Sequence, residues 1–274
     1  MPPDLSRIRS TRSEAKFQTL TRRFQSRPTV IAEGDSWFAY PPRALIAGPP
    51  SNVVDHIKNM RRYNLLQLAS SGDESVDMLT GSSKFRLVGL LEKYDVDFLL
   101  FSGGGNDIVG ARDFDFFLKR DVSSNDWRSY LHMDRVERRL RMVGDSYRDL
   151  IDYCRSYSRN PGLQVVTHTY DYARPDPQGA RFLGGIIDGK SWVHPYLREA
   201  GVPEAFDQTI VDHLIDALAS QLLDLEARFP DTLRVADTRG SLTPGDEKLW
   251  INEIHPSEKG FRKIARKVFD RMNA

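Results

Sequence analysis

Short apolar runs alternate with longer segments of helical periodicity along the chain, and this alternation limits the possible folds more than any other feature. The apolar runs predict strands at residues 29–33, 65–69, 97–102, 163–169 and 232–237. Helical patterns lie between and after them, in a segment capped by Ser51 and at about 75–94, 136–157, 204–228 and 257–272. Strands joined by helices favour right-handed crossovers. The sequence therefore predicts an α/β fold, a three-layer α/β/α sandwich with a mostly parallel five-stranded sheet and a flavodoxin-like outline.

Three segments stand outside this alternation. Residues 1–27 are polar and basic, and we expect them to form an extension outside the main core, ahead of a domain of residues 28–274. Insertions at about 110–133 and 171–200 mix aromatic residues with glycine, proline and charged residues. Insertions of this length are more often lids or binding loops than idle coil, so we expect the second one to cover a site.

Charge and cysteine content exclude several classes of protein. Lys and Arg total 39 against 38 Asp and Glu, a net charge of +1, which gives no field to draw the protein onto nucleic acid or an anionic membrane. The one cysteine, Cys154, excludes an intramolecular disulfide and predicts a buried thiol. No run approaches the roughly 20 apolar residues of a membrane span. The N-terminus lacks the apolar core of a signal peptide and predicts a cytoplasmic protein, although a removed leader would leave the same pattern.

Polar motifs follow the predicted strands, at the edge of a parallel sheet where ligands bind. They are Gly34-Asp35-Ser36, Ser71-Gly72-Asp73, Gly104-Gly105-Asn106-Asp107 and, before the last helix, Asn252-Glu253-Ile254-His255-Pro256. The glycines at 103–105 lack the Lys-Ser/Thr of a phosphate loop, and no pair of histidines has the spacing of metal ligands. We therefore expect no nucleotide, no metal and no other cofactor.

This ordered set of four motifs resembles the SGNH (GDSL) hydrolase family over residues 34–260. The resemblance implies that Ser36 is the nucleophile and His255 the general base. It also implies an oxyanion hole formed by the main-chain amides of Ser36 and Gly72 and the side chain of Asn106. A serine hydroxyl becomes a good nucleophile when an imidazole accepts its proton, which a histidine with a pKa near ~6.5 can do at neutral pH.

The chain departs from the family pattern three residues before the histidine, where Asn252 stands in place of the usual aspartate. An asparagine can hold the imidazole by a hydrogen bond, but it cannot stabilise imidazolium by charge. Glu253, Asp237 or Asp171 could supply that charge instead, and the sequence leaves this choice open.

Two further groups of residues yield expectations about the site. Trp37, Phe38 and Tyr40 follow the proposed nucleophile, and Trp192 lies in the second insertion, so we expect these rings to wall an apolar or sugar-stacking pocket. A second Gly-Asp-Ser sequence ends at Ser146 inside a helical pattern, and we expect this serine to be an ordinary helix residue. His168 or His194 could also contact substrate.

The leading functional prediction is a lipase-like serine esterase. It would hydrolyse a small-molecule carboxylic ester or thioester through an acyl-enzyme on Ser36. One alternative is an acyltransferase that uses the same serine and passes the acyl group to an alcohol instead of water. Another is a non-catalytic binding module on a hydrolase scaffold, which the departure at Asn252 suggests.

Overall fold

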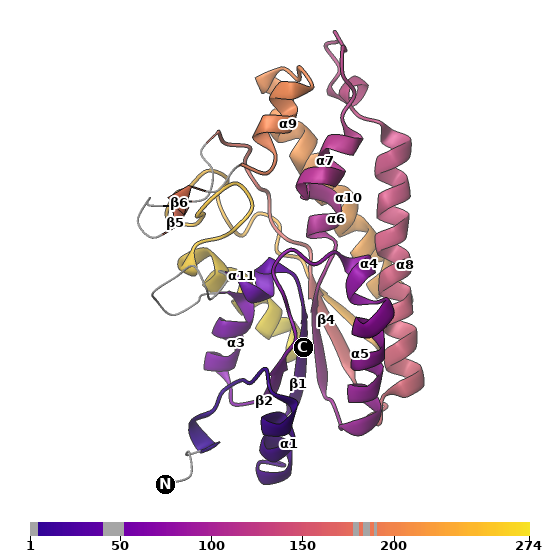
Figure 1. Ribbon diagram of the computed structural model, residues 1–274, viewed down its shortest axis with the longest axis vertical. Helices are drawn as coiled ribbons and strands as arrows, with labels where there is room; N and C mark the ends of the chain where they lie inside the picture. Colours follow the sequence, from indigo (N-terminus) through magenta and orange to yellow (C-terminus); the bar gives the residue numbers. More distant parts are fainter. Residues whose placement is uncertain (1–4, 41–51, 178–180, 183–186, 189–190) are drawn as a thin grey trace.

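The computed structural model describes residues 5–40, 52–177, 181–182, 187–188 and 191–274, and Figure 1 shows a central sheet between two layers of helices. The strands of this sheet are β1 (Thr29–Gly34), β2 (Asn64–Gln67), β3 (Phe98–Ser102), β4 (Gln164–His168) and β7 (Leu233–Ala236). They lie in the order β2-β1-β3-β4-β7, and all neighbouring pairs are parallel. The predicted α/β fold with a five-stranded sheet is confirmed.

The strand order reverses at β1, because the chain passes from β1 to β2 on one side and then returns to β3 on the other. Such a switch point opens a crevice at the carboxyl ends of the two inner strands. Gly34 ends β1 opposite Ser102 of β3. A Cβ atom on Gly34 would lie 2.7 Å from the Cβ atom of Ser102, so glycine lets the two strand ends approach at the crevice.

Helices cover both faces of the sheet, as a buried parallel sheet requires. On one side α3 (Val53–Met60) packs against α11 (Glu258–Met272), and on the other α8 (Met133–Tyr157) packs against both α5 (Gly81–Lys93) and α10 (Glu204–Arg228) (Figure 1). Helix α11 forms because its apolar residues recur at helical spacing and are buried, namely Phe261, Ile264, Val268 and Met272. The Ser257 hydroxyl accepts a hydrogen bond from the Gly260 amide and caps its start.

Two predicted helix boundaries are wrong. The pattern at 75–94 forms two helices, α4 (Ser75–Met78) and α5, because the chain breaks at Gly81 with a φ of +51°. The predicted cap Ser51 lies outside the described residues. Helix α3 is capped by Asn52, whose Oδ1 accepts a hydrogen bond of 3.0 Å from the Asp55 amide.

The N-terminal segment is not wholly outside the core, which corrects that expectation. It forms η1 (Leu5–Arg7) and α1 (Glu14–Arg23), and the side chains of Phe17 and Leu20 have no exposed surface. Thr11 also pairs with Leu66 of β2 in a parallel bridge. A single apolar pair in a polar segment is enough to dock this helix, and the segment covers the outer edge of β2.

Both insertions contain short elements. The first forms α7 (Ala111–Phe117) and η2 (Trp127–Tyr130), and the second forms β5 (Arg181–Phe182), β6 (Ile187–Asp188) and α9 (His194–Glu199). Phe114, Phe117 and Leu131 bury the first insertion against the domain. Among the helices of the described residues, none is both long enough and apolar enough to cross a membrane.

Candidate active site

Ser36 lies where β1 ends and the four-residue helix α2 (Ser36–Ala39) begins. Asp35 is the N-cap, and its Oδ1 accepts a hydrogen bond of 2.9 Å from the Trp37 amide. Because Ser36 is the first residue of α2, its own amide belongs to the first turn, whose N–H groups have no partner within a helix. The serine is therefore held at the carboxyl edge of the sheet by a rigid strand and a capped turn.

His255 reaches Ser36 from the loop before α11, with 2.8 Å between its Nε2 and the serine Oγ. Its imidazole stacks on the ring of Tyr40 at a centroid distance of 4.1 Å and meets the ring of Trp192 at 5.5 Å. Burial lowers the pKa of His255 to about 3, because a charged imidazole would be poorly solvated there. At neutral pH the ring is therefore neutral and carries one proton.

Asn252 determines which nitrogen of His255 carries that proton. Its Oδ1 accepts hydrogen bonds from the amides of Ile254 and His255, at 3.1 and 2.9 Å, so the atom facing the loop is the oxygen. The same oxygen lies 3.1 Å from Nδ1 of His255. Nδ1 must then be the donor, which leaves Nε2 free to accept the hydroxyl proton of Ser36.

The Glu253 carboxylate points away from His255 into the second insertion. It accepts hydrogen bonds from four main-chain amides, those of Asp176, Trp192, Val193 and His194. The last three amides lie at the start of α9, where a carboxylate is favoured by the helix dipole. Glu253 thus anchors the insertion that places Trp192 against the histidine ring.

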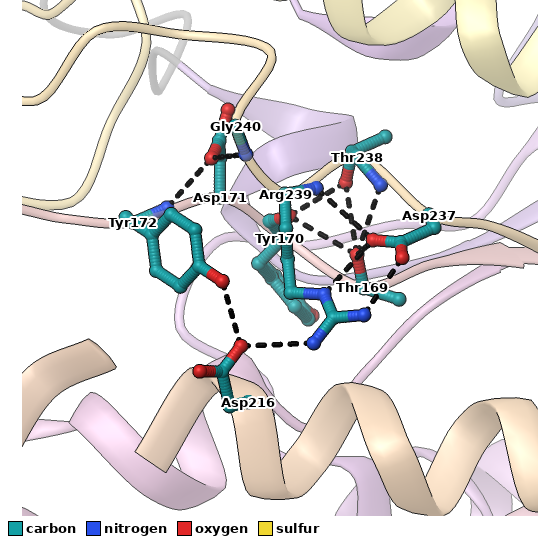
Figure 2. Close-up of polar contacts among 9 residues, drawn as sticks. All are labelled: Thr169, Tyr170, Asp171, Tyr172, Asp216, Asp237, Thr238, Arg239 and Gly240. Atoms are coloured by element: carbon teal, nitrogen blue, oxygen red, sulfur yellow. Dashed lines mark hydrogen bonds and ion pairs between the residues drawn. The ribbon is translucent and has the colours of Figure 1, made fainter. Parts of the chain in front are cut away.

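Asp171 and Asp237 are also bound elsewhere, in a polar cluster where β4 and β7 end (Figure 2). Asp171 accepts hydrogen bonds from the amides of Tyr172, Gly240 and Leu242, at 2.8, 2.7 and 2.7 Å. Asp237 forms two hydrogen bonds with the guanidinium of Arg239. Among the described residues no carboxylate forms an ion pair with His255, so Asn252 is the side chain that contacts Nδ1.

Asn106 lies on α6 (Gly105–Val109), directly after β3. Its Nδ2 donates one hydrogen bond of 2.9 Å to the Asp73 carbonyl, which orients the carboxamide and leaves a second N–H. Asp107 accepts hydrogen bonds from the amide and hydroxyl of Ser75. Asn106 thus ties α6 to the loop after β2, and Asp107 ties it to the start of α4. In that loop Gly72 has a φ of +93°, a conformation that favours glycine.

A buried polar chain lies behind Ser36, and the sequence motifs did not reveal it. Nδ1 of His168 accepts the Tyr170 amide, so its Nε2 donates to Ser102 Oγ at 2.9 Å. Ser102 donates in turn to Asp35 at 2.7 Å, and the Tyr170 hydroxyl donates to the other oxygen of Asp35 at 2.5 Å. Burial raises the pKa of Asp35 to about 6, and these hydrogen bonds oppose that rise. The sequence held one sign of this hydrogen-bonded network, because Ser102 and His168 are polar residues that each end an apolar strand.

The aromatic residues predicted to wall a pocket take different positions. Phe38 has no exposed surface and packs near His168, so its expected contact with substrate is wrong. Trp37 is buried and donates from Nε1 to the Ile254 carbonyl at 3.1 Å, while Tyr40 supports the His255 ring. Trp192 is half-buried at the edge of that ring and remains a predicted substrate contact.

Other predicted residues lie away from the site. His168 is completely buried and therefore cannot contact substrate. Ser146 lies on α8 and donates a hydrogen bond of 3.0 Å to the Met142 carbonyl, as expected of a helix residue. Cys154 is a buried free thiol, as predicted.

Solved structures with this fold cover most of the chain. An extracellular lipase from Streptomyces rimosus covers 88% of the chain and 99% of its own length, with 15% identity and a TM-score of 0.52. A protein assigned as an SGNH hydrolase from Slackia heliotrinireducens covers 90% of the chain and 99% of its own length, with 12% identity and a TM-score of 0.50. Phospholipase A1 from Streptomyces albidoflavus NA297 covers 88% of the chain and 99% of its own length, with 16% identity and a TM-score of 0.50. No protein-family model and no curated protein matches the sequence itself. The chain has the fold of the SGNH hydrolases.

Proposed function

We propose that the protein is a serine esterase that hydrolyses a carboxylic ester or thioester, with Ser36 as nucleophile and His255 as general base. The observation that carries this proposal is the contact of 2.8 Å between Ser36 Oγ and His255 Nε2, made by a neutral ring whose Nδ1 donates to Asn252. A hydroxyl hydrogen-bonded to an oriented base is the arrangement that nucleophilic catalysis requires. The fold shared with lipases supports the same chemistry.

In the first half of the reaction, Ser36 Oγ attacks the carbonyl carbon while His255 Nε2 takes its proton. The carbonyl oxygen becomes negative, and the second N–H of Asn106 and the amides of Ser36 and Gly72 are the donors proposed to hold it. The imidazolium then gives its proton to the leaving oxygen or sulfur, and an acyl-enzyme remains on Ser36. Water, deprotonated by His255, attacks the acyl carbon in the second half and releases the acid.

The proposal is tested by mapping covalent labelling with a fluorophosphonate probe. The probe should label wild-type protein at Ser36, identified by peptide mass spectrometry, and p-nitrophenyl acetate should be turned over by the same preparation. Product analysis in the presence of added methanol measures how the acyl-enzyme divides between water and an alcohol. A hydrolase should yield mainly the acid, and a transferase mainly the methyl ester. Folded protein that takes up no label would favour a binding module instead.

Replacing Asn252 by aspartate should raise kcat at neutral pH, because a carboxylate stabilises the imidazolium formed during attack. The substitution keeps the loop contacts, since an aspartate oxygen can still accept the amides of Ile254 and His255. In a serine protease the opposite change costs about 10⁴ in kcat, which sets an upper limit on the gain. We expect a gain of about 10-fold or more.

The pH profile provides a second readout of the same variant. The base must be unprotonated, so kcat/KM falls as pH drops through the pKa of His255, which burial holds near 3 in the wild type. Aspartate at position 252 should raise that pKa and move the acid limb of kcat/KM to higher pH. Asn252→Ala should instead lose about 10²-fold in kcat because the tautomer is no longer fixed. A wild-type rate in Asn252→Ala would remove Asn252 from the mechanism.

A further inference from the structure

A small pocket opens beside Ser36, and Asn106 lies on its wall as well. Its free volume is about 20 Å³. A water molecule needs roughly 10–15 Å³ of such space, so the pocket holds one group of about that size. Apart from these two residues, the wall has an apolar part and a polar part. The apolar part is formed by Trp37, Val109, Ala173, Ile215 and Ile254, and the rest by Asp35, Gly105, Tyr170 and Asp171.

The apolar wall is fixed by packing and hydrogen bonds from several elements. Val109 ends α6, and Ile215 lies in the buried face of α10. The amide of Ile254 donates to Asn252 and its carbonyl accepts from Trp37, which holds this residue from both sides. The Ala173 carbonyl accepts a hydrogen bond of 2.9 Å from Gln208 of α10. Enlarging the pocket would break such contacts, so its size selects what can enter.

The positions of the reacting groups determine which part of an ester enters this pocket. The acyl carbon must lie between Ser36 Oγ, which attacks it, and Asn106, which holds its oxygen, and both residues line the pocket. The leaving oxygen must instead reach His255 Nε2, and His255 is not on the pocket wall. The substituent of the acyl carbon therefore points into the pocket, and the leaving alcohol points away from it.

We infer that the substrate is an acetyl ester, in which the acyl substituent is a single methyl group, and that Ile215 and Val109 limit its length. This inference rests on the proposed esterase activity and names its substrate class. A methyl group is close to water in size and fills the pocket, whereas each added methylene meets a buried apolar wall. One excess methylene in an apolar pocket changes kcat/KM by about 10–200-fold.

The test uses p-nitrophenyl acetate, propionate, butyrate and hexanoate, which share one leaving group. Wild-type kcat/KM should fall by about 10-fold or more from acetate to butyrate. Ile215→Ala should raise the ratio of butyrate to acetate by a similar factor, because three carbon atoms leave the wall. Ile210→Ala is the matched control, since Ile210 lies on the same helix, is fully buried and does not line the pocket. The ratio of butyrate to acetate for Ile210→Ala should stay at the wild-type value.

The outcomes separate this inference from the proposed function. Wild-type protein that hydrolyses butyrate or hexanoate faster than acetate would overturn the acetyl assignment and leave the esterase intact. Equal shifts in Ile215→Ala and Ile210→Ala would overturn it as well. No turnover of any ester, together with no fluorophosphonate labelling of folded protein, would instead be a failure of the proposed function. If Ile215→Ala does not fold, Val109→Ala tests the same wall, and the wild-type profile alone still decides.

Discussion

Ser36→Ala is expected to abolish ester hydrolysis, with a loss of about 10⁴-fold or more in kcat. The reason is that the variant has no oxygen within reach of His255 Nε2 to attack the acyl carbon, although the proposed oxyanion donors remain. The measurement is kcat with p-nitrophenyl acetate, together with labelling by the fluorophosphonate probe. Both signals should disappear while the thermal unfolding midpoint stays close to that of the wild type, since only one oxygen atom is removed.

The chain carries its own control for this experiment, because Gly144-Asp145-Ser146 repeats the same three residues. Ser146 lies within α8, where its hydroxyl donates to the Met142 carbonyl, and among the described residues it forms no hydrogen bond with a histidine. Ser146→Ala should therefore keep the wild-type kcat and the full extent of labelling. Equal labelling of both single variants would contradict the assignment of Ser36 as the nucleophile.

Asn106→Ala is expected to lower kcat by about 10²–10³ with a smaller change in KM, because its contact strengthens only as charge develops on the oxygen. The existing hydrogen bond to the Asp73 carbonyl orients the carboxamide and uses one of its two N–H groups. Steady-state kinetics with p-nitrophenyl acetate separates the two constants. A purely binding role would show the reverse pattern, a higher KM with an unchanged kcat.

A structural effect of the same substitution has a separate readout. Asp107 still holds Ser75 at the start of α4 after Asn106 is replaced, so the segment that follows β2 keeps two of its three hydrogen bonds to α6. The thermal unfolding midpoint should therefore change little. A large drop in that midpoint alongside the loss of kcat would mean that Asn106 acts mainly by holding the loop.

The fold could be predicted because its elements are long and regular. Helix α10 spans Glu204–Arg228, the range that its apolar periodicity predicts, and the buried strands appear as short apolar runs. The break at Gly81 could not be seen, since helical periodicity continues on both sides of it. The buried face of α1 consists of Phe17 and Leu20, and two apolar residues leave no recognisable pattern.

The site was less predictable, because neighbouring residues in a loop or short helix can point in different directions. Asn252 and Glu253 are adjacent, yet one contacts His255 and the other binds the insertion. Likewise Phe38 enters the core while Tyr40, two residues later, stacks on the histidine. Sequence motifs at strand ends indicated which segments meet, and only the three-dimensional arrangement showed what each side chain contacts there.

The anchor formed by Glu253 has a consequence for how a substrate reaches Ser36. Moving the backbone of residues 192–194 outward would strip a buried carboxylate of three of its four amide donors, and uncompensated burial of such a charge is costly. This part of the insertion is therefore held in place beside the histidine ring. In the proposed esterase, we expect the alcohol portion of the ester to pass the edge of Trp192, so that the shape of this portion would decide which esters reach Ser36.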